Sequence, residues 1–355
     1  MTIWNRAGVL NQNMSSIASE FADTTWGWHA ERLLRQSEKV SSQEQLYELL
    51  NLAEMGLALS SAESGRRRAL SLALLDHPLS ARYNPYWRSA VGEFYQRALS
   101  RALAQIGRAQ VTSGWRVWKI YNMGFVVKTA THTIGFDIHP GWVFQNPLSN
   151  EQQEQLADML DLLLISHYHA DHLNPSFMQK MVERKKPVVL PASVWRLPNT
   201  GRLDNGPKRY IQEDQESHQT FAGLYVHSYL GAQWRVIRNA VYVVEVDGLH
   251  ILHPGDNENL QIYECVAQNH DIDLYLANCW AKLGESVARI RPHTVITGHE
   301  QEISHPSPFL HSFQSSFQQL AHMRRDNPDL MAKMAAHVLA WGEGAEERRS
   351  RGADH

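Results

Sequence analysis

The chain has 355 residues, 43% of them hydrophobic, which is enough for a sizeable core in one large domain or two. Its 34 basic and 37 acidic residues give a formal net charge of −3, so its composition does not favour nucleic acid or an anionic membrane surface as a partner. With two cysteines, no signal-peptide pattern and no long apolar run, we expect no disulfide framework, no thiolate metal site and no membrane span. These features predict a cytoplasmic protein.

Residues 1–110 are predicted to be helical. Ser42 and Gln45 have the spacing of a capping box before an apolar run at helical spacing. Asn84 and Pro85 suit the start of a further helix, because proline is favoured at a first helical position. No catalytic cluster stands out here. We expect this region to cover the rest of the molecule as a lid or to form the interface of a homo-oligomer.

Residues 111–342 are predicted to alternate strands with helices. The first strands are short and rich in β-branched and aromatic residues, as in WRVWKIY, FVVKTA and HTIGFDI. Helices are expected near 150–160, 174–184, 257–269, 282–290 and 306–325. Such an alternation indicates a layered α/β sandwich. The polar residues 343–355 are predicted to be a disordered tail.

The stretch LLLISHYHADH (162–172) runs from an apolar strand directly into three histidines and an aspartate. A uniformly apolar strand is typically buried on both faces, and side chains that follow its carboxyl end lie at the rim of the sheet. In an extended segment, residues two apart point the same way, so His167 and His169 are predicted to share one metal ion. Asp171 and His172 can address a second position. Imidazole and carboxylate ligands suit zinc, iron or manganese.

The motif SHYHADH resembles the HxHxDH signature of the metallo-β-lactamase superfamily, and the resemblance extends over about residues 112–325. It implies an αββα sandwich with one or two metal ions at the edge of the sheets. It also implies that Asp256, in HILHPGD, bridges two ions and that His299, in HTVITGHE, is the last histidine ligand. Asp137, in TIGFDIHPG, would support the site from nearby. Asp171 would orient or deprotonate the attacking water as well as bind metal.

One ligand expected from this resemblance is missing. Many members of the superfamily have a third histidine for the first metal ion at a strand end where this sequence reads Gly231-Ala232-Gln233. A lactonase-like branch, which resembles the ascorbate-phosphate lactonases, also lacks it. His305, Glu302 and Glu300 are candidates for an extra ligand or pocket group, as is the mid-strand residue His227.

Four further residues lie close to these landmarks in the sequence. His139 and His253 are expected beside the ligands, where they can orient them. Arg235 and Arg238 follow the strand that lacks the third histidine. Arginines there can hold a phosphate or carboxylate of the substrate through paired hydrogen bonds.

Three functions fit these observations. The first is a metal-dependent hydrolase that uses a metal-activated water on an ester, lactone, thioester, amide or phosphodiester of a small molecule. Zn²⁺ is the metal ion expected, with Mn²⁺ and Fe²⁺ as alternatives. The second is a di-iron oxygenase on the same fold. The third is a non-catalytic scaffold, although a scaffold has no need of buried ionisable ligands.

Overall fold

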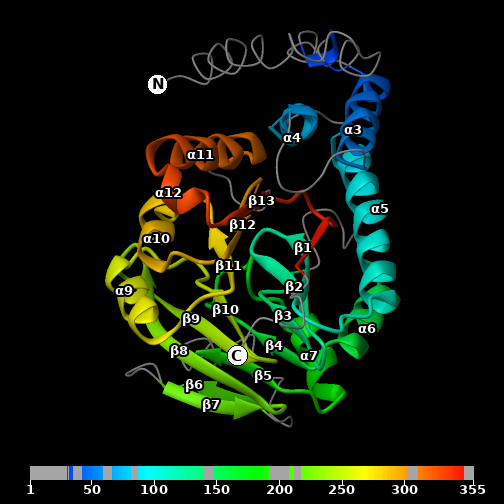
Figure 1. Ribbon diagram of the computed structural model, residues 1–355. Helices are drawn as coiled ribbons and strands as arrows, with labels where there is room; N and C mark the ends of the chain where they lie inside the picture. Colours follow the sequence, from blue (N-terminus) through cyan, green and yellow to red (C-terminus); the bar gives the residue numbers. More distant parts are fainter. Residues whose placement is uncertain are drawn as a thin grey trace.

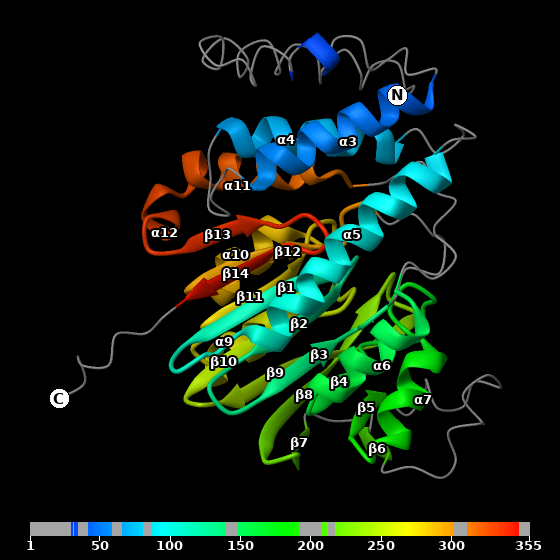
Figure 2. The same ribbon diagram turned by 90° about the vertical axis from the view of Figure 1, so that its right-hand side faces the viewer.

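Two β-sheets packed face to face form the centre of the molecule, and helices cover the outer side of each (Figures 1 and 2). Within the residues that the structure describes, each sheet has seven strands. This is the αββα layering expected from the sequence. The computed structural model describes residues 30, 32–34, 42–58, 66–80, 87–139, 148–191, 208–211, 217–301 and 311–347.

The first sheet contains the strand that leads into the histidine motif. Its strands lie in the order β14-β1-β2-β3-β4-β5-β6. The strands from β3 to β6 are parallel, so their carboxyl ends meet at one edge. The strand bounds are β1 (Trp115–Tyr121), β2 (Gly124–Lys128), β3 (Thr133–Phe136), β4 (Leu162–Leu164), β5 (Val188–Pro191), β6 (Lys208–Ile211) and β14 (Gly344–Glu347).

The second sheet has the order β13-β12-β11-β10-β9-β8-β7. Its strands β10 to β13 are parallel to one another. Because β9 is antiparallel to both β8 and β10, the carboxyl end of β8 lies at the same edge as that of β10. The strand bounds are β7 (Ser217–Phe221), β8 (Leu224–Gln233), β9 (Ile237–Val246), β10 (Leu249–His253), β11 (Leu274–Asn278), β12 (Thr294–Gly298) and β13 (Ala335–Val338).

The strand β4 shows why the stretch before the histidines is uniformly apolar. Leu162 and Leu164 belong to the core between the two sheets. Leu163 points the other way, into the core between the first sheet and its helices. Since alternate side chains of a strand face opposite sides, a strand covered on both sides needs an apolar residue at every position.

Helices cover both outer faces (Figure 2). A helix is present near each predicted position; the one expected at 150–160, for example, begins after Ser149, which forms a capping box with Gln152. The one expected at 306–325 begins at Phe313, and residues 306–310 lie outside the described part. On the first sheet lie α5 (Trp87–Arg108), α6 (Asn150–Met159) and α7 (Pro175–Glu183). On the second lie α9 (Leu260–Asn269), α10 (Leu283–Ile290), α11 (Phe313–Asp326) and α12 (Pro328–Met331). None of the helices in the described ranges is long and apolar enough to cross a membrane.

The described part of residues 1–110 is helical, as predicted, and packs directly on the sandwich. Here α4 (Arg66–Ser80) lies between α3 (Gln43–Ala58) and α11. The buried guanidinium of Arg68 donates to the carbonyl of Val338 at 3.0 Å and forms an ion pair with Glu343 at 2.6 Å. Residues of these helices and of the sandwich share one apolar core.

The prediction of a disordered tail from residue 343 is wrong for the four residues of β14. This strand pairs with β1 in antiparallel register, from Trp115 opposite Glu347 to Trp118 opposite Gly344. A polar composition does not prevent an edge strand, because its outward side chains stay in water while its backbone completes the hydrogen bonds of its neighbour. The sandwich therefore extends to residue 347. Residues 348–355 lie outside the described part.

Candidate metal centre

The predicted ligands follow strand ends that meet at one edge of the two sheets. His167 follows β4, Asp256 follows β10 and His299 follows β12 directly. Close packing brings the two sheets together here. A Cβ atom on Gly255 would lie 2.5 Å from the Cβ of Ser166, and Gly255 has a φ of +56°. Only glycine fits this backbone without strain, and its absent side chain lets Asp256 approach the histidine motif.

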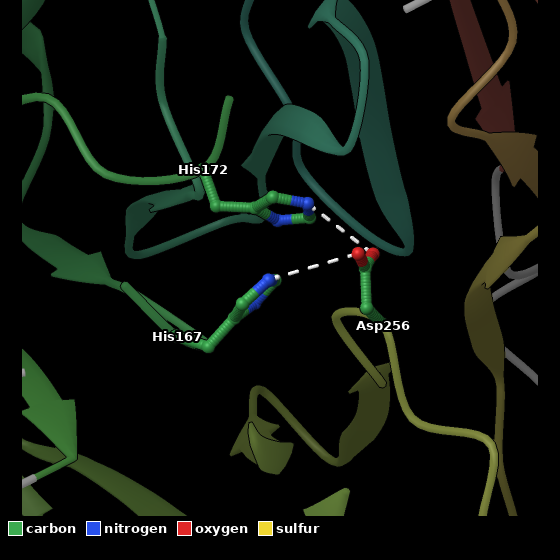
Figure 3. A group of neighbouring side chains, drawn as sticks. All are labelled: His167, His172 and Asp256. Carbon is green, nitrogen blue, oxygen red and sulfur yellow. Dashed lines mark ion pairs between the residues drawn. The ribbon is translucent and has the colours of Figure 1, made fainter. Parts of the chain in front are cut away.

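One group of donor atoms consists of His167, His172 and Asp256, whose side chains converge in Figure 3. The Nε2 atom of His172 lies 3.2 Å from Oδ1 of Asp256, and Nε2 of His167 lies 3.6 Å from Oδ2. His169 lies at the rim of this group, half-buried, with Nδ1 at 3.0 Å from Nε2 of His167. The carboxylate of Asp256 thus has one oxygen toward each of the two buried imidazoles.

A second group consists of Asp171, His172 and His299. Oδ2 of Asp171 lies 3.1 Å from Nε2 of His172 and 3.4 Å from Nε2 of His299. The same His299 atom lies 3.3 Å from Oδ1 of Asp256. The two groups share His172 and adjoin through Asp256, so the structure brings all six predicted ligands into one cluster at two neighbouring positions.

The donor atoms of this cluster fit divalent cations. Nε2 of His172 and Nε2 of His299 are buried and have no hydrogen-bond partner in the described part of the chain. Buried polar atoms are costly unless something satisfies them. Nitrogen and carboxylate oxygen donors without thiolate match zinc, manganese or iron, and a catalytic zinc site needs three such donors and an open position.

The charges of the cluster are strongly coupled. Burial alone would lower the pKa of His172, but Asp256, Asp171 and Asp137 outweigh it and raise that pKa well above its usual range. The pKa of His299 rises to about 10, against the effect of burial, chiefly because of Asp256. Without a cation, these carboxylates hold protons on both imidazoles. A metal ion must therefore displace protons when it binds.

The opposite side of His172 is held by Asp137, as the resemblance implied. The Nδ1 atom of His172 lies 2.7 Å from Oδ2 of Asp137, which also accepts a hydrogen bond from the hydroxyl of Ser166 at 2.6 Å. A carboxylate can only accept, so Nδ1 carries the proton and Nε2 faces the cluster. Asp137 itself has a φ of +42°, in the left-handed region.

Three amide side chains that sequence reasoning did not assign to the site hold the two carboxylates. Asn122 donates to Oδ2 of Asp171 at 2.6 Å. Asn278 and Gln233 donate to Oδ1 and Oδ2 of Asp256, each at 2.9 Å. Asn278 and Gln233 are the last residues of β11 and β8. A polar residue at the end of a strand at this edge is the sequence feature that could have predicted their place in the site.

The remaining candidates lie around the cluster or apart from it. His253 is buried, 3.7 Å from Oδ2 of Asp137, and its Nε2 contacts the carbonyl of Met123 at 3.0 Å. His139 is buried as well, and burial lowers its pKa to about 4. Both lie beside the ligands as expected.

Other predicted pocket groups are not brought into the cluster. His227 lies in the middle of β8 with its ring 4.6 Å from that of His270. Glu300 is fully buried in an ion pair with Lys119, so the structure places it in a different contact from the one predicted. Arg235 and Arg238 are exposed in and after the turn that joins β8 and β9. Glu302 and His305 lie outside the described residues.

Comparison with known proteins agrees with this fold. The profile of the beta-lactamase superfamily domain matches residues 142–279, which include the histidine motif and Asp256. No curated protein matches the chain. A metallo hydrolase from Ignicoccus hospitalis KIN4/I is 13% identical with a TM-score of 0.51, over 67% of this chain and 100% of that chain. A possible metal-dependent hydrolase from Veillonella parvula DSM 2008 is 14% identical with a TM-score of 0.50, over 66% and 99%.

A third solved structure concerns a different chemistry. CmlA, a diiron β-hydroxylase from Streptomyces venezuelae, is 14% identical with a TM-score of 0.49, over 68% of this chain and 55% of that chain. At this TM-score and identity, we infer nothing about the function of this chain from CmlA. The family match covers residues 142–279, and the described part of the chain has the fold of these metallo hydrolase structures.

Proposed function

We propose that this protein is a metal-dependent hydrolase that cleaves an ester, lactone, thioester, amide or phosphodiester bond of a small molecule. The proposal depends mainly on one observation. Six side chains with nitrogen and carboxylate donors converge at the edge of two rigid sheets, and two of their buried imidazole nitrogens lie 3.1–3.4 Å from the carboxylates without forming a hydrogen bond in the described part of the chain. Sites built on strand ends are well ordered, which hydrolysis requires for positioning the attacking water.

The residues would hold two cations at adjacent positions. His167, His169 and Asp256 would bind at the first position; His172, Asp171 and His299 would bind at the second, where Asp256 also contributes. A divalent ion bound there would lower the pKa of water and polarise the oxygen of the bond to be cleaved. Zn²⁺ is the ion we propose first, because its ligand preferences match the donor set.

Asp171 would receive the proton of the attacking water. Its Oδ2 is engaged by Asn122, His172 and His299, which leaves Oδ1 as the oxygen for a water molecule. Burial alone would raise the pKa of Asp171, but His172 and His299 outweigh it and hold the pKa well below its usual range. The side chain is therefore ionised and able to accept a hydrogen bond at neutral pH.

The rim of the cluster carries aromatic side chains that a substrate would contact. Trp234 and Tyr168 are 55% and 40% exposed. Their rings lie 5.9 Å and 5.1 Å from that of His169. The ring of Trp280 lies 5.6 Å from that of His299. Aromatic faces beside a polar centre suit a substrate with an apolar group next to the bond that is cleaved.

The test is elemental analysis of protein purified without added metal, followed by an activity screen. We expect zinc, and hydrolysis of chromogenic esters, lactones, thioesters or phosphodiesters that a chelator abolishes and zinc restores. Asp171→Asn should lower kcat at least about 100-fold, the lower end of what a positioned base contributes.

Two outcomes would overturn the proposal. Iron in the purified protein together with oxygen consumption would favour the oxygenase alternative. Wild-type protein that binds no divalent ion at micromolar concentration would favour the non-catalytic scaffold.

A further inference from the structure

Gln233 stands where the third histidine of the first metal position was expected. It is the last residue of β8, and its side chain is 3% exposed. It reaches Asp256, which follows β10. Strand β9 lies between β8 and β10, and the carboxyl ends of β8 and β10 are at the same sheet edge. A long polar side chain in this buried position is unusual unless its amide has partners on both ends.

The orientation of the Gln233 amide follows from its contact. Its terminal nitrogen or oxygen lies 2.9 Å from Oδ2 of Asp256, the oxygen that faces His167. A carboxylate only accepts hydrogen bonds. The atom in contact is therefore Nε2, and the remaining atom is the amide oxygen.

That oxygen is left without a partner. Oε1 of Gln233 is buried and accepts no hydrogen bond from any described residue. An unsatisfied buried acceptor costs about 1–3 kcal/mol. Nothing in the described chain offsets this cost, whereas a cation held by His167 and Asp256 would, since amide oxygens bind divalent ions.

We propose that Gln233 is a ligand of the first metal ion, through Oε1, in place of the missing histidine. This inference depends on the proposed metal centre and adds a residue to it. Nε2 keeps Asp256 turned toward His167, and Oε1 supplies the further donor. The first position would then be held by two imidazoles, a carboxylate and a neutral amide.

The experiment separates binding by Gln233 from mere support of Asp256. Zinc is titrated into metal-free full-length protein by competition with a chromophoric chelator, in two backgrounds. His299→Ala disables the second position, so the remaining affinity reports on the first. His169→Ala disables the first, so the remaining affinity reports on the second. Each background is combined with Gln233→Leu or Gln233→Glu, and Gln261→Glu, on an exposed residue of α9, is the matched control.

If Gln233 is a ligand, Gln233→Leu weakens zinc binding at the first position about 10–100-fold, the loss typical of removing a group that supports a metal site. The second position changes less than about twofold. Gln233→Glu keeps an oxygen donor and restores binding at the first position. When both are loaded with Co²⁺, the single variant Gln233→Leu also differs from the wild-type protein in its visible absorption bands, which report coordination number. This spectrum serves if a double variant fails to fold.

Two results would overturn the inference. If Gln233 only supports Asp256, both positions weaken together in Gln233→Leu, and Gln233→Glu is worse because its charge repels Asp256. Unchanged affinity at both positions would show that the amide has no part in metal binding. Neither result affects the proposed hydrolase, whose failure would appear as wild-type protein that binds no metal.

Discussion

Two buried groups of charged side chains lie next to each other in this protein and differ in how their charges are balanced. The metal cluster, made of the six predicted ligands, gathers carboxylates and imidazoles with no lysine or arginine among them. The second group, which we call the paired network, is Lys119 with Glu300 and Arg68 with Glu343. The two groups are adjacent in sequence at one point: His299 belongs to the cluster and Glu300, the next residue, to the network.

The difference shows which buried charges can bind a metal ion. In the paired network a cationic side chain already occupies the place next to each carboxylate, so a metal ion has no position to enter. Among the described residues of the cluster, the balancing charges are protons on His172 and His299, which a divalent ion can displace. The cluster is therefore the group whose donors could hold a metal ion, whereas the network joins elements of the fold.

The largest effect is expected from removing residues 1–110. The loss of Arg68 leaves Glu343 without its partner, and the apolar core shared with α3, α4 and α5 becomes exposed. Such a chain should aggregate or remain unfolded. Gel filtration and circular dichroism measure this. A soluble, monomeric and equally active chain would show that the helices are an independent appendage.

Breaking the ion pair inside the network should have the next largest effect. Lys119→Met leaves Glu300 buried without its cation, which costs about 3–5 kcal/mol of unfolding free energy. The double variant Lys119→Met/Glu300→Leu should recover most of the loss, because an apolar pair replaces the ionic one. Urea denaturation measures both. Equal stability of wild type and the single variant would mean that the network does not join the fold.

Asp76, on α4, allows a test by pH. It accepts hydrogen bonds from the side chain of Gln301 at 2.6 Å and from the backbone of Phe313 and Gln314 at 2.9 Å and 2.7 Å. Burial outweighs these bonds and raises the pKa of Asp76 from 3.8 to about 7. The folded chain then holds the proton more tightly than the unfolded chain. Its contribution to stability is greatest below about pH 4 and is lost as the pH rises through 7, by up to about 4 kcal/mol.

The variant Asp76→Asn cannot titrate and provides the comparison. Its melting temperature relative to wild type should rise between pH 5 and pH 7 and then level off. Thermal melts at several pH values measure this difference. A difference that stays constant between pH 5 and pH 7 would mean that the three hydrogen bonds keep Asp76 ionised throughout.

In the metal cluster, a similar substitution should change metal content more than the fold. Asp256→Asn removes a carboxylate oxygen from both positions, so bound zinc should fall and a chelator should no longer lower the melting temperature. Asp326→Asn, on an exposed aspartate at the end of α11, is the control. Elemental analysis and thermal melts provide the measurements. Full zinc content in Asp256→Asn would remove Asp256 from the ligand set.

The smallest effect concerns the order in which the positions fill. The second position has three donors of its own besides Asp256, whereas the first has His167, the half-exposed His169 and the neutral amide of Gln233. We expect zinc to fill the second position first, with the first about tenfold weaker. A two-step titration isotherm would show it. Two equally tight positions would mean that a group outside the described residues, such as His305, completes the first.

Local patterns in the sequence indicated a layered α/β sandwich and the candidate ligands His167, His169, Asp171 and His172, whereas Asp256 and His299 were predicted from the resemblance to a known superfamily. The uniformly apolar Leu162–Leu164 and the short spacing from His167 to His172 are properties of neighbouring residues, and the period of a strand fixes which way each points. The pairing of 344–347 with β1 was not visible, because a polar edge strand has no signal until its partner is known.

Only the tertiary structure decided the partners of the cluster. Asn122 lies 49 residues from its partner Asp171, and Gln233 and Asn278 lie 23 and 22 residues from Asp256, and nothing local distinguishes their amides from others. Glu300, next to a ligand in sequence, proved to face Lys119 instead. The physical reason is that parallel strand ends bring distant residues to one edge, while the turn that follows each strand decides which side chain points into the site.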